Sequence, residues 1–151
     1  LRNGYLHSAI REKGGAYGSG AIQDSKNMIF KFFSYRDPRC SETFNDFKKS
    51  IKWSLKNITE ENLEEGILGI ISNIDKPLSP YGEAMSDFTS LVDKKDPEKR
   101  LHFRAKVKEC TVKDLINVSS KYLLNDSSKS LIAGENYIEE IKRLNFKIQN
   151  I

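Results

Sequence analysis

The sequence predicts an α+β fold in which helices cover an antiparallel sheet. Residues 16–35 contain two strand-like segments around a polar break, and from Ser41 onward the apolar period changes from two to about 3.6 residues. The length of 151 residues, with 38% hydrophobic and 30% charged residues, suits one core that folds in water. We therefore expect a single domain over residues 1–151.

The first predicted element is an amphipathic helix over residues 1–13, whose apolar side chains fall on two adjacent rows. Gly14 and Gly15 are expected to end it, because glycine readily adopts the left-handed conformation that closes many helices. The chain opens within this helical pattern and without Met, so we expect it to be a piece of a longer protein.

A β-hairpin is predicted next, from residues 16–23 and 28–35. The four residues between these segments are polar and are typical of a connection between antiparallel strands. Apart from Lys31 and Ser34, the second segment is apolar on both alternations. We therefore expect this strand to be central in its sheet.

Helical periodicity dominates the rest of the chain. Helices are expected from Ser41, from Thr59 to about Pro77, over 80–92, over 97–109 and from Thr111 through Leu124. Each begins at a residue that can cap it, and two of these caps precede a proline. Residues 125–129 are expected to form a loop, followed by a buried strand over 130–134, a short helix over 136–143 and a last strand over 146–151.

Trp53 lies about 180° from the apolar stripe of its predicted helix, which includes Phe44, Ile51 and Leu55. We therefore expect it to face away from the core of this domain.

The composition indicates which partners and which cellular location to expect. The net charge of +4 is small and the basic and acidic residues are mixed, so we expect no nucleic-acid partner. No apolar run is long enough to span a bilayer and no signal peptide begins the chain, so we expect no membrane partner and a cytoplasmic location. An organellar location, with its signal outside this sequence, is the alternative. Cys40 and Cys110 are expected to be free thiols.

Several kinds of catalytic site are disfavoured by the motifs. His7 and His102 have no metal-ligating partner at helical spacing, so no metal site is expected in this chain. No G-x-S-x-G motif supports a hydrolase triad. The glycine-rich stretch GGAYGSG follows a helix and enters a strand, which is the reverse of the order found in phosphate-binding loops.

The segment IREKGGAYGSG carries the most specific signal, with an arginine near a helix end, a diglycine turn and a tyrosine entering a strand. It resembles the C-terminal half of the pitrilysin or insulinase-like zinc peptidases, most closely their presequence-protease and falcilysin branch. The resemblance extends to the leading helix GYLHSAIR, the strand end FFSYRDPR and the later segment IDKPLSPYG.

The resemblance implies that the chain is the C-terminal, substrate-binding part of a zinc metalloendopeptidase that degrades short unstructured peptides. In that family two related halves enclose the peptide, and an H-x-x-E-H zinc motif lies in the N-terminal half. This chain lacks the motif, so zinc is expected in the complete enzyme but not in this fragment, which should be inactive alone. The expected partners are the N-terminal catalytic half and an unstructured peptide.

The resemblance also implies roles for individual residues. Arg11 and Tyr17 match an arginine and a tyrosine that reach the substrate, and Gly14 and Gly15 form the turn between them. A guanidinium can donate to peptide carbonyls, and a phenol can donate to the oxygen that becomes negative during hydrolysis. Tyr17 is therefore the expected catalytic residue, and all four residues are expected to bind substrate.

Less specific interpretations remain open. Taken singly, Arg11 would be a surface arginine and Tyr17 a strand-packing residue, and only their joint context favours a site. Residues 35–37 match the family's strand end and are expected to form a turn-stabilising network. The alternative for the whole chain is a catalytically silent domain that binds peptides or forms a structural part of a peptidase-like shell.

Overall fold

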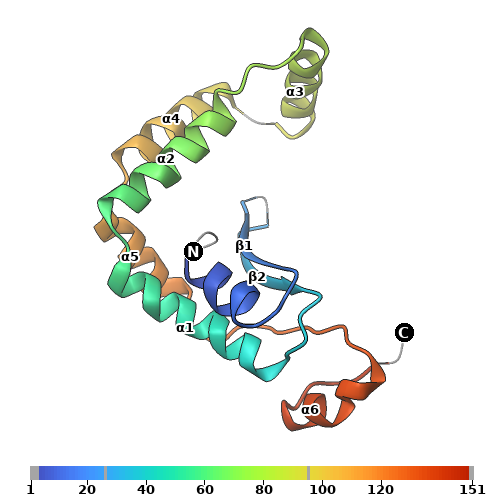
Figure 1. The fold of residues 1–151 in the computed structure, drawn as a ribbon. Coiled ribbons are helices and arrows are strands. Elements are labelled where there is room, and N and C mark those ends of the chain that lie inside the picture. Colours follow the sequence, from blue (N-terminus) through green and yellow to red (C-terminus); the bar gives the residue numbers. More distant parts are fainter. Residues whose placement is uncertain (1–3, 26, 95, 150–151) are drawn as a thin grey trace. The chain divides into compact units, whose positions relative to one another are not determined.

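The computed structural model describes residues 4–25, 27–94 and 96–149, and it confirms the α+β class (Figure 1). The chain forms two compact units, Leu1–Asn57 with Ser119–Ile151 and Ile58–Val118, which are described separately. The single domain expected over residues 1–151 stays a prediction. In chain order the elements are η1 (His7–Glu12), β1 (Gly18–Asp24), β2 (Ile29–Tyr35), α1 (Ser41–Asn57), α2 (Glu60–Ile74), α3 (Pro80–Val92), α4 (Pro97–Glu109), α5 (Val112–Tyr122), η2 (Glu135–Tyr137) and α6 (Ile138–Arg143).

The first unit is built around the predicted hairpin, which is confirmed. Strands β1 and β2 pair antiparallel, with Gly18 opposite Tyr35 and Asp24 opposite Ile29. The buried core of this unit lies where η1, the sheet and α1 meet. It consists of Leu6, Ile10 and Ala16, with Ala9, Ala21, Phe32 and Phe47 packed against it.

The prediction that β2 is central in its sheet is wrong for the described residues, where β2 pairs with β1 alone. Its apolar side chains are unequally covered along the strand. Phe32 stacks on Phe47 of α1 with ring centroids 5.4 Å apart, whereas Ile29 and Phe30, nearer the hairpin turn, are 44% and 40% exposed. An apolar pattern on both faces indicates which side chains favour burial, but it supplies no neighbouring strand.

Helix α1 buries small polar residues as well as apolar ones. Thr43 and Ser50 are 5% and 0% exposed, and the Ser50 hydroxyl donates to the Phe47 carbonyl at 2.7 Å. Trp53 lies outside the core cluster of this unit and is 36% exposed, in agreement with its predicted orientation. Its ring lies 5.8 Å from that of Tyr5, which partly covers it.

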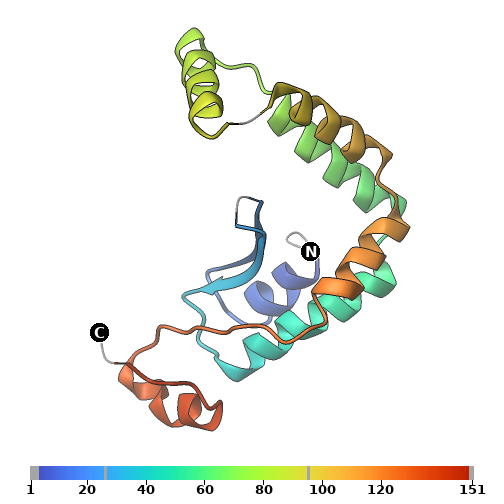
Figure 2. The same cartoon turned by 180° about the vertical axis from the view of Figure 1, so that it is seen from behind.

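The chain after α5 returns along α1 as an irregular segment before reaching η2 and α6, as Figure 2 shows from behind. The buried strand predicted over 130–134 is wrong: these residues are irregular, and Ile132 is 86% exposed. No strand lies beside this segment in the described ranges, so its apolar run has no ladder to join. The helix predicted over 136–143 is confirmed as η2 and α6.

The last segment is anchored at the start of α1. The N–H and the hydroxyl of Ser41 both donate to Glu140 Oε1 at 2.9 Å, and Ser41 is the first residue of α1 rather than the capping residue before it. The rings of Phe44 and Phe146 lie 5.6 Å apart. Residues 146–149 are irregular, contrary to the strand predicted there, and residues 150–151 of that prediction lie outside the described ranges.

The second unit is helical, and its predicted helices and caps are confirmed. Thr59, Ser79 and Asp96 accept hydrogen bonds from the first turns of α2, α3 and α4. Arg104 of α4 holds Asp75 at the end of α2 with bonds of 3.0 and 2.6 Å. Among the described residues of this unit, Leu63 is the one apolar side chain that is buried. No helix in the described ranges combines the length and apolarity needed to cross a membrane.

Candidate functional site

The candidate site begins where η1 ends and β1 starts. The N–H of Gly15 donates to the Arg11 carbonyl at 3.0 Å, and the N–H of Ala16 donates to the Ile10 carbonyl at 3.1 Å. Gly15 has a φ of 80°, a conformation that glycine adopts without a steric penalty. The two bonds close the helix much as a Schellman motif does, and each reaches one residue further back because η1 is a π-helix.

Arg39, which lies between β2 and α1, supports this turn through hydrogen bonds. Its Nη1 donates to Asp46 Oδ2 at 3.2 Å, and its Nη2 donates to the Ala9 carbonyl at 3.5 Å. Gly14 is buried beneath the guanidinium, and a Cβ at that position would overlap both Arg39 and the carbonyl oxygen of Ile10. The close approach of Arg39 therefore requires glycine at position 14.

Asp37 fixes the chain that leads from β2 to α1. Its carboxylate accepts hydrogen bonds from the Ser34 hydroxyl at 2.6 Å, the Thr43 hydroxyl at 2.7 Å and the Arg39 N–H at 3.0 Å. Its side chain is only 9% exposed. Asp37 thus forms the turn-stabilising network that was expected at this strand end.

Tyr17 lies in an exposed cluster with Tyr35 and Arg36, which we call the arginine–tyrosine cluster. The Tyr17 and Tyr35 rings meet edge to face with centroids 6.1 Å apart. The Arg36 guanidinium lies 5.8 Å from the centroid of the Tyr17 ring and 5.5 Å from that of Tyr35. Tyr17 is 67% exposed, so this cluster leaves most of its side chain available to a ligand.

Arg11 is exposed on the last turn of η1. Within the described ranges, no hydrogen bond or ion pair holds its guanidinium, and no direct contact joins it to the Tyr17 ring. The structure thus places Arg11 and Tyr17 on the two sides of one hydrogen-bonded turn, with Gly14 and Gly15 between them. Both side chains are exposed.

The sequence reasoning missed Arg39 and gave no specific role to Arg36. A signal for Arg36 was present in the hairpin, because the register that sets Gly18 opposite Tyr35 brings Tyr17 opposite Arg36. The Tyr17 N–H donates to the Arg36 carbonyl at 3.3 Å, in agreement with this pairing. No comparable signal marked Arg39, whose partners come from three separate segments.

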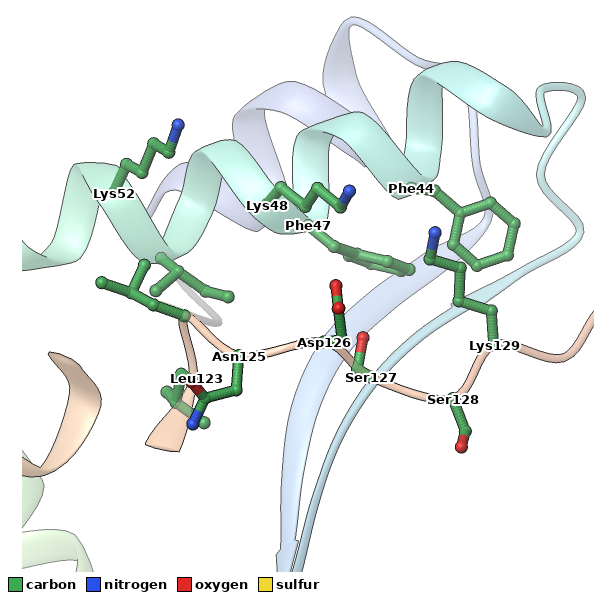
Figure 3. A pocket seen from close by; sticks show the side chains of 12 residues that line it. Phe44, Phe47, Lys48, Lys52, Leu123, Asn125, Asp126, Ser127, Ser128 and Lys129 are labelled. Carbon is green, nitrogen blue, oxygen red and sulfur yellow. The ribbon is translucent and has the colours of Figure 1, made fainter. Parts of the chain in front are cut away.

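A second feature of this unit is a groove of about 330 Å³ between α1 and residues 123–129 (Figure 3). Phe44 and Phe47 line its apolar wall, and the Lys129 ammonium lies 5.9 Å from the Phe44 ring centroid. The groove shares no lining residue with the turn that carries Arg11 and Tyr17.

In the ranges that the structure describes, no three His, Cys, Asp or Glu side chains are grouped to hold an ion. The Cys40 thiol is buried and free. Burial raises its pKa, and the nearby carboxylates of Glu140, Asp37 and Glu42 raise it further.

Known proteins resemble this chain over most of its length. The sequence matches the PreP C-terminal domain family over residues 1–133. It is 34% identical over 134 residues to the mitochondrial presequence protease of Yarrowia lipolytica, covering 88% of this chain and 13% of that protein. It is 39% identical over 120 residues to the mitochondrial presequence protease of Xenopus tropicalis, and the match covers 79% of this chain and 11% of that protein. It is 36% identical over 132 residues to that of Saccharomyces cerevisiae, and the match covers 86% of this chain and 13% of that protein. The chain therefore spans 11–13% of the length of these relatives.

Proposed function

The chain belongs to the PreP C-terminal domain family, and on that premise we propose that it is the substrate-binding part of a zinc metalloendopeptidase that degrades short unstructured peptides. The observation that carries the proposal is the family match over residues 1–133, which includes the whole candidate site. Its relatives are named presequence proteases, so the chain is a part of a peptidase.

In this proposal Tyr17 and Arg11 act on the peptide in different ways. The Tyr17 hydroxyl donates to the carbonyl oxygen that becomes negative during hydrolysis, so its contribution grows as the reaction proceeds. The Arg11 guanidinium donates to peptide carbonyls that are already present in the bound substrate. Gly14 and Gly15 keep the backbone of the turn compact beside the peptide.

The geometry favours a ligand-binding role over a structural one. Arg39 holds the turn through part-buried hydrogen bonds to Ala9 and Asp46, whereas Arg11 is exposed and Tyr17 is 67% exposed. A backbone that other residues support can present two free side chains in a fixed geometry, which is what substrate positioning requires.

Among the residues that the structure describes, no three His, Cys, Asp or Glu side chains are grouped as zinc ligands. The proposal assigns zinc to the N-terminal half of the protease, which would also enclose the peptide. We further propose an organellar location, because the relatives are named mitochondrial; this fits the organellar alternative, and the cytoplasmic location expected from the sequence is not supported.

The test uses the full-length protease that carries this domain and an unstructured peptide. In Tyr17→Phe we expect kcat to fall by roughly 10² with little change in KM, because one transition-state donor is lost. Arg11→Ala should raise KM and lower kcat/KM, and Arg11→Lys should not restore either, because an ammonium lacks the planar fork. Tyr122→Phe, which alters an exposed tyrosine on α5, is the matched control.

Two outcomes would contradict the proposal. Full turnover by Tyr17→Phe would remove Tyr17 from the reaction. A full-length wild-type protein that binds the peptide but never cleaves it would favour the alternative, a silent peptide-binding part of the shell.

A further inference from the structure

Arg36 has an unusual backbone conformation for its position. Its φ is 48°, in the left-handed region that side chains other than glycine rarely adopt. The other described non-glycine residues with positive φ lie in the hairpin turn or directly after a helix, where such a conformation is common; they are Met28, Lys94 and Asn145. Arg36 instead follows the last residue of a strand, and this strain suggests a functional constraint.

The conformation of Arg36 explains how the arginine–tyrosine cluster forms. Successive side chains of a regular strand point to opposite faces, so Tyr35 and Arg36 would normally separate. The left-handed turn at Arg36 breaks this alternation. Both side chains therefore lie against Tyr17, with the guanidinium 5.8 Å from the Tyr17 ring centroid.

The charge of Arg36 is not used elsewhere. In the described part of the chain no carboxylate pairs with its guanidinium, whereas Arg39 and Arg104 both have carboxylate partners. Its contacts are with two aromatic rings, an arrangement in which a cation is attracted to the ring face.

We propose that Arg36 is a positioning residue, whose guanidinium holds the Tyr17 ring in the orientation from which its hydroxyl donates to the peptide. The proposal rests on the role given above to Tyr17. An exposed tyrosine at the start of a strand samples several rotamers, and a cation–π contact would select one of them.

The experiment compares Arg36→Asn with Tyr17→Phe in the full-length protease, alone and combined. Asparagine accepts the left-handed conformation, so Arg36→Asn removes the guanidinium while keeping the backbone. We expect kcat to fall about fivefold and KM to change by less than about twofold, with an unchanged Tm. In a Tyr17→Phe background the same change should lower kcat by less than about twofold, because the positioned hydroxyl is already absent.

A second readout follows the ring itself. With 3-fluorotyrosine at position 17, the ¹⁹F resonance should shift in Arg36→Asn and in Arg36→Gly, which relieves any remaining strain. Lys31→Asn is the matched control, because it removes an exposed cation from β2, the strand that Arg36 follows, and Lys31 pairs with Ile22 rather than lying beside Tyr17. It should change neither kcat nor the ¹⁹F resonance.

The outcomes separate this proposal from the proposed function. If Tyr17→Phe is slow but Arg36→Asn is fully active, or if the two losses multiply, the role of Arg36 is wrong and that of Tyr17 stands. An unshifted ¹⁹F resonance in both Arg36 variants would also contradict the positioning contact. Full turnover by Tyr17→Phe would contradict the proposed site and, with it, the positioning role.

Discussion

The turn between η1 and β1 and the helical unit Ile58–Val118 are stabilised in different ways. The turn is held by buried side chains, since Leu6 and Ile10 are fully buried beside it, and by Arg39, which lies on a loop that Asp37 fixes by accepting from three donors. The helical unit depends on exposed end groups, such as the Thr59 cap and the bond between Arg104 and Asp75, and has one buried apolar side chain in the described ranges. Buried interactions of the first kind fix atomic positions more firmly than exposed ones.

This difference explains why exposed functional groups can be positioned at the turn. Arg11 and Tyr17 need not stabilise the backbone that carries them, because Arg39 and Gly14 already do so. A side chain that does not stabilise the fold can serve binding or catalysis alone. If the comparison holds, substitutions beneath the turn should cost more stability than substitutions at the helix ends of the second unit.

Gly14→Ala should have the largest effect on stability. The new Cβ would overlap the Arg39 guanidinium and the carbonyl oxygen of Ile10, and the latter cannot move without disturbing η1. We expect the free energy of opening of η1 to fall by about 3 kcal/mol, as measured by hydrogen exchange of its amides. Gly18→Ala is the control, because a Cβ there meets no atom within 4 Å. Equal effects of the two changes would contradict the close packing of Arg39 on Gly14.

Asp37→Ala is expected to be the next most damaging change. It leaves the Ser34 and Thr43 hydroxyls and the Arg39 N–H without their acceptor in a largely buried place. Urea unfolding should show a loss of about 2 kcal/mol. Asp126→Ala, in an exposed irregular segment, should change stability by less than about 0.5 kcal/mol. A loss below that value for Asp37→Ala would show that the network contributes little.

Local signals in the sequence predicted most of the elements, because caps and turns are determined by neighbouring residues. Thr59 and Asp96 cap the helices they were expected to cap, and two antiparallel strands do pair on either side of the predicted polar break, although Asp24 belongs to β1. The errors lie where the outcome depends on distant segments. The strand predicted over 130–134 needs a partner strand, and the central place predicted for β2 needs a second one.

The sequence predicted the candidate site in part, as it predicted the fold in part. The motif that contains Arg11 and Tyr17 is continuous in sequence, so a resemblance could identify it. The residues that hold the motif are not continuous: Arg39 bonds to Ala9 and Asp46, which lie 30 residues before it and seven after it. The burial of a hydroxyl such as that of Ser50 also cannot be predicted from the sequence, because serine is mostly exposed in folded proteins.

Thr59→Ala tests the other side of the comparison. The Thr59 hydroxyl accepts from the Asn62 N–H at 3.3 Å, and the Asn62 side chain accepts from the Thr59 N–H, so alanine removes half of this reciprocal cap. We expect the amides of α2 to lose about 1 kcal/mol of protection in hydrogen exchange. Thr59→Ser should retain most of it. A loss as large as that of Gly14→Ala would mean that the caps stabilise this unit as strongly as burial stabilises the turn.

The pH dependence of Asp75 should be the smallest effect. Hydrogen bonds from Arg104 are the main cause that lowers the pKa of this carboxyl, and the charges of Arg104, Lys108 and Arg100 lower it further. A carboxyl with a lowered folded-state pKa stabilises the fold above its unfolded pKa of about 3.9, and the contribution disappears as the pH falls through the lowered value.

Carboxyl ¹³C titration should therefore find the Asp75 pKa below its ordinary value, and Arg104→Gln should raise it. Asp114 is the internal control, because the hydroxyl and N–H of Thr111 lower its pKa and Arg104 has no part in the shift. Its titration should stay unchanged in Arg104→Gln. Both groups are exposed, so added salt should weaken the charge contribution at Asp75 and leave the hydrogen-bonded shift at Asp114 largely intact. An Asp75 pKa that does not respond to Arg104→Gln would show that the hydrogen bond between α2 and α4 does not persist in solution.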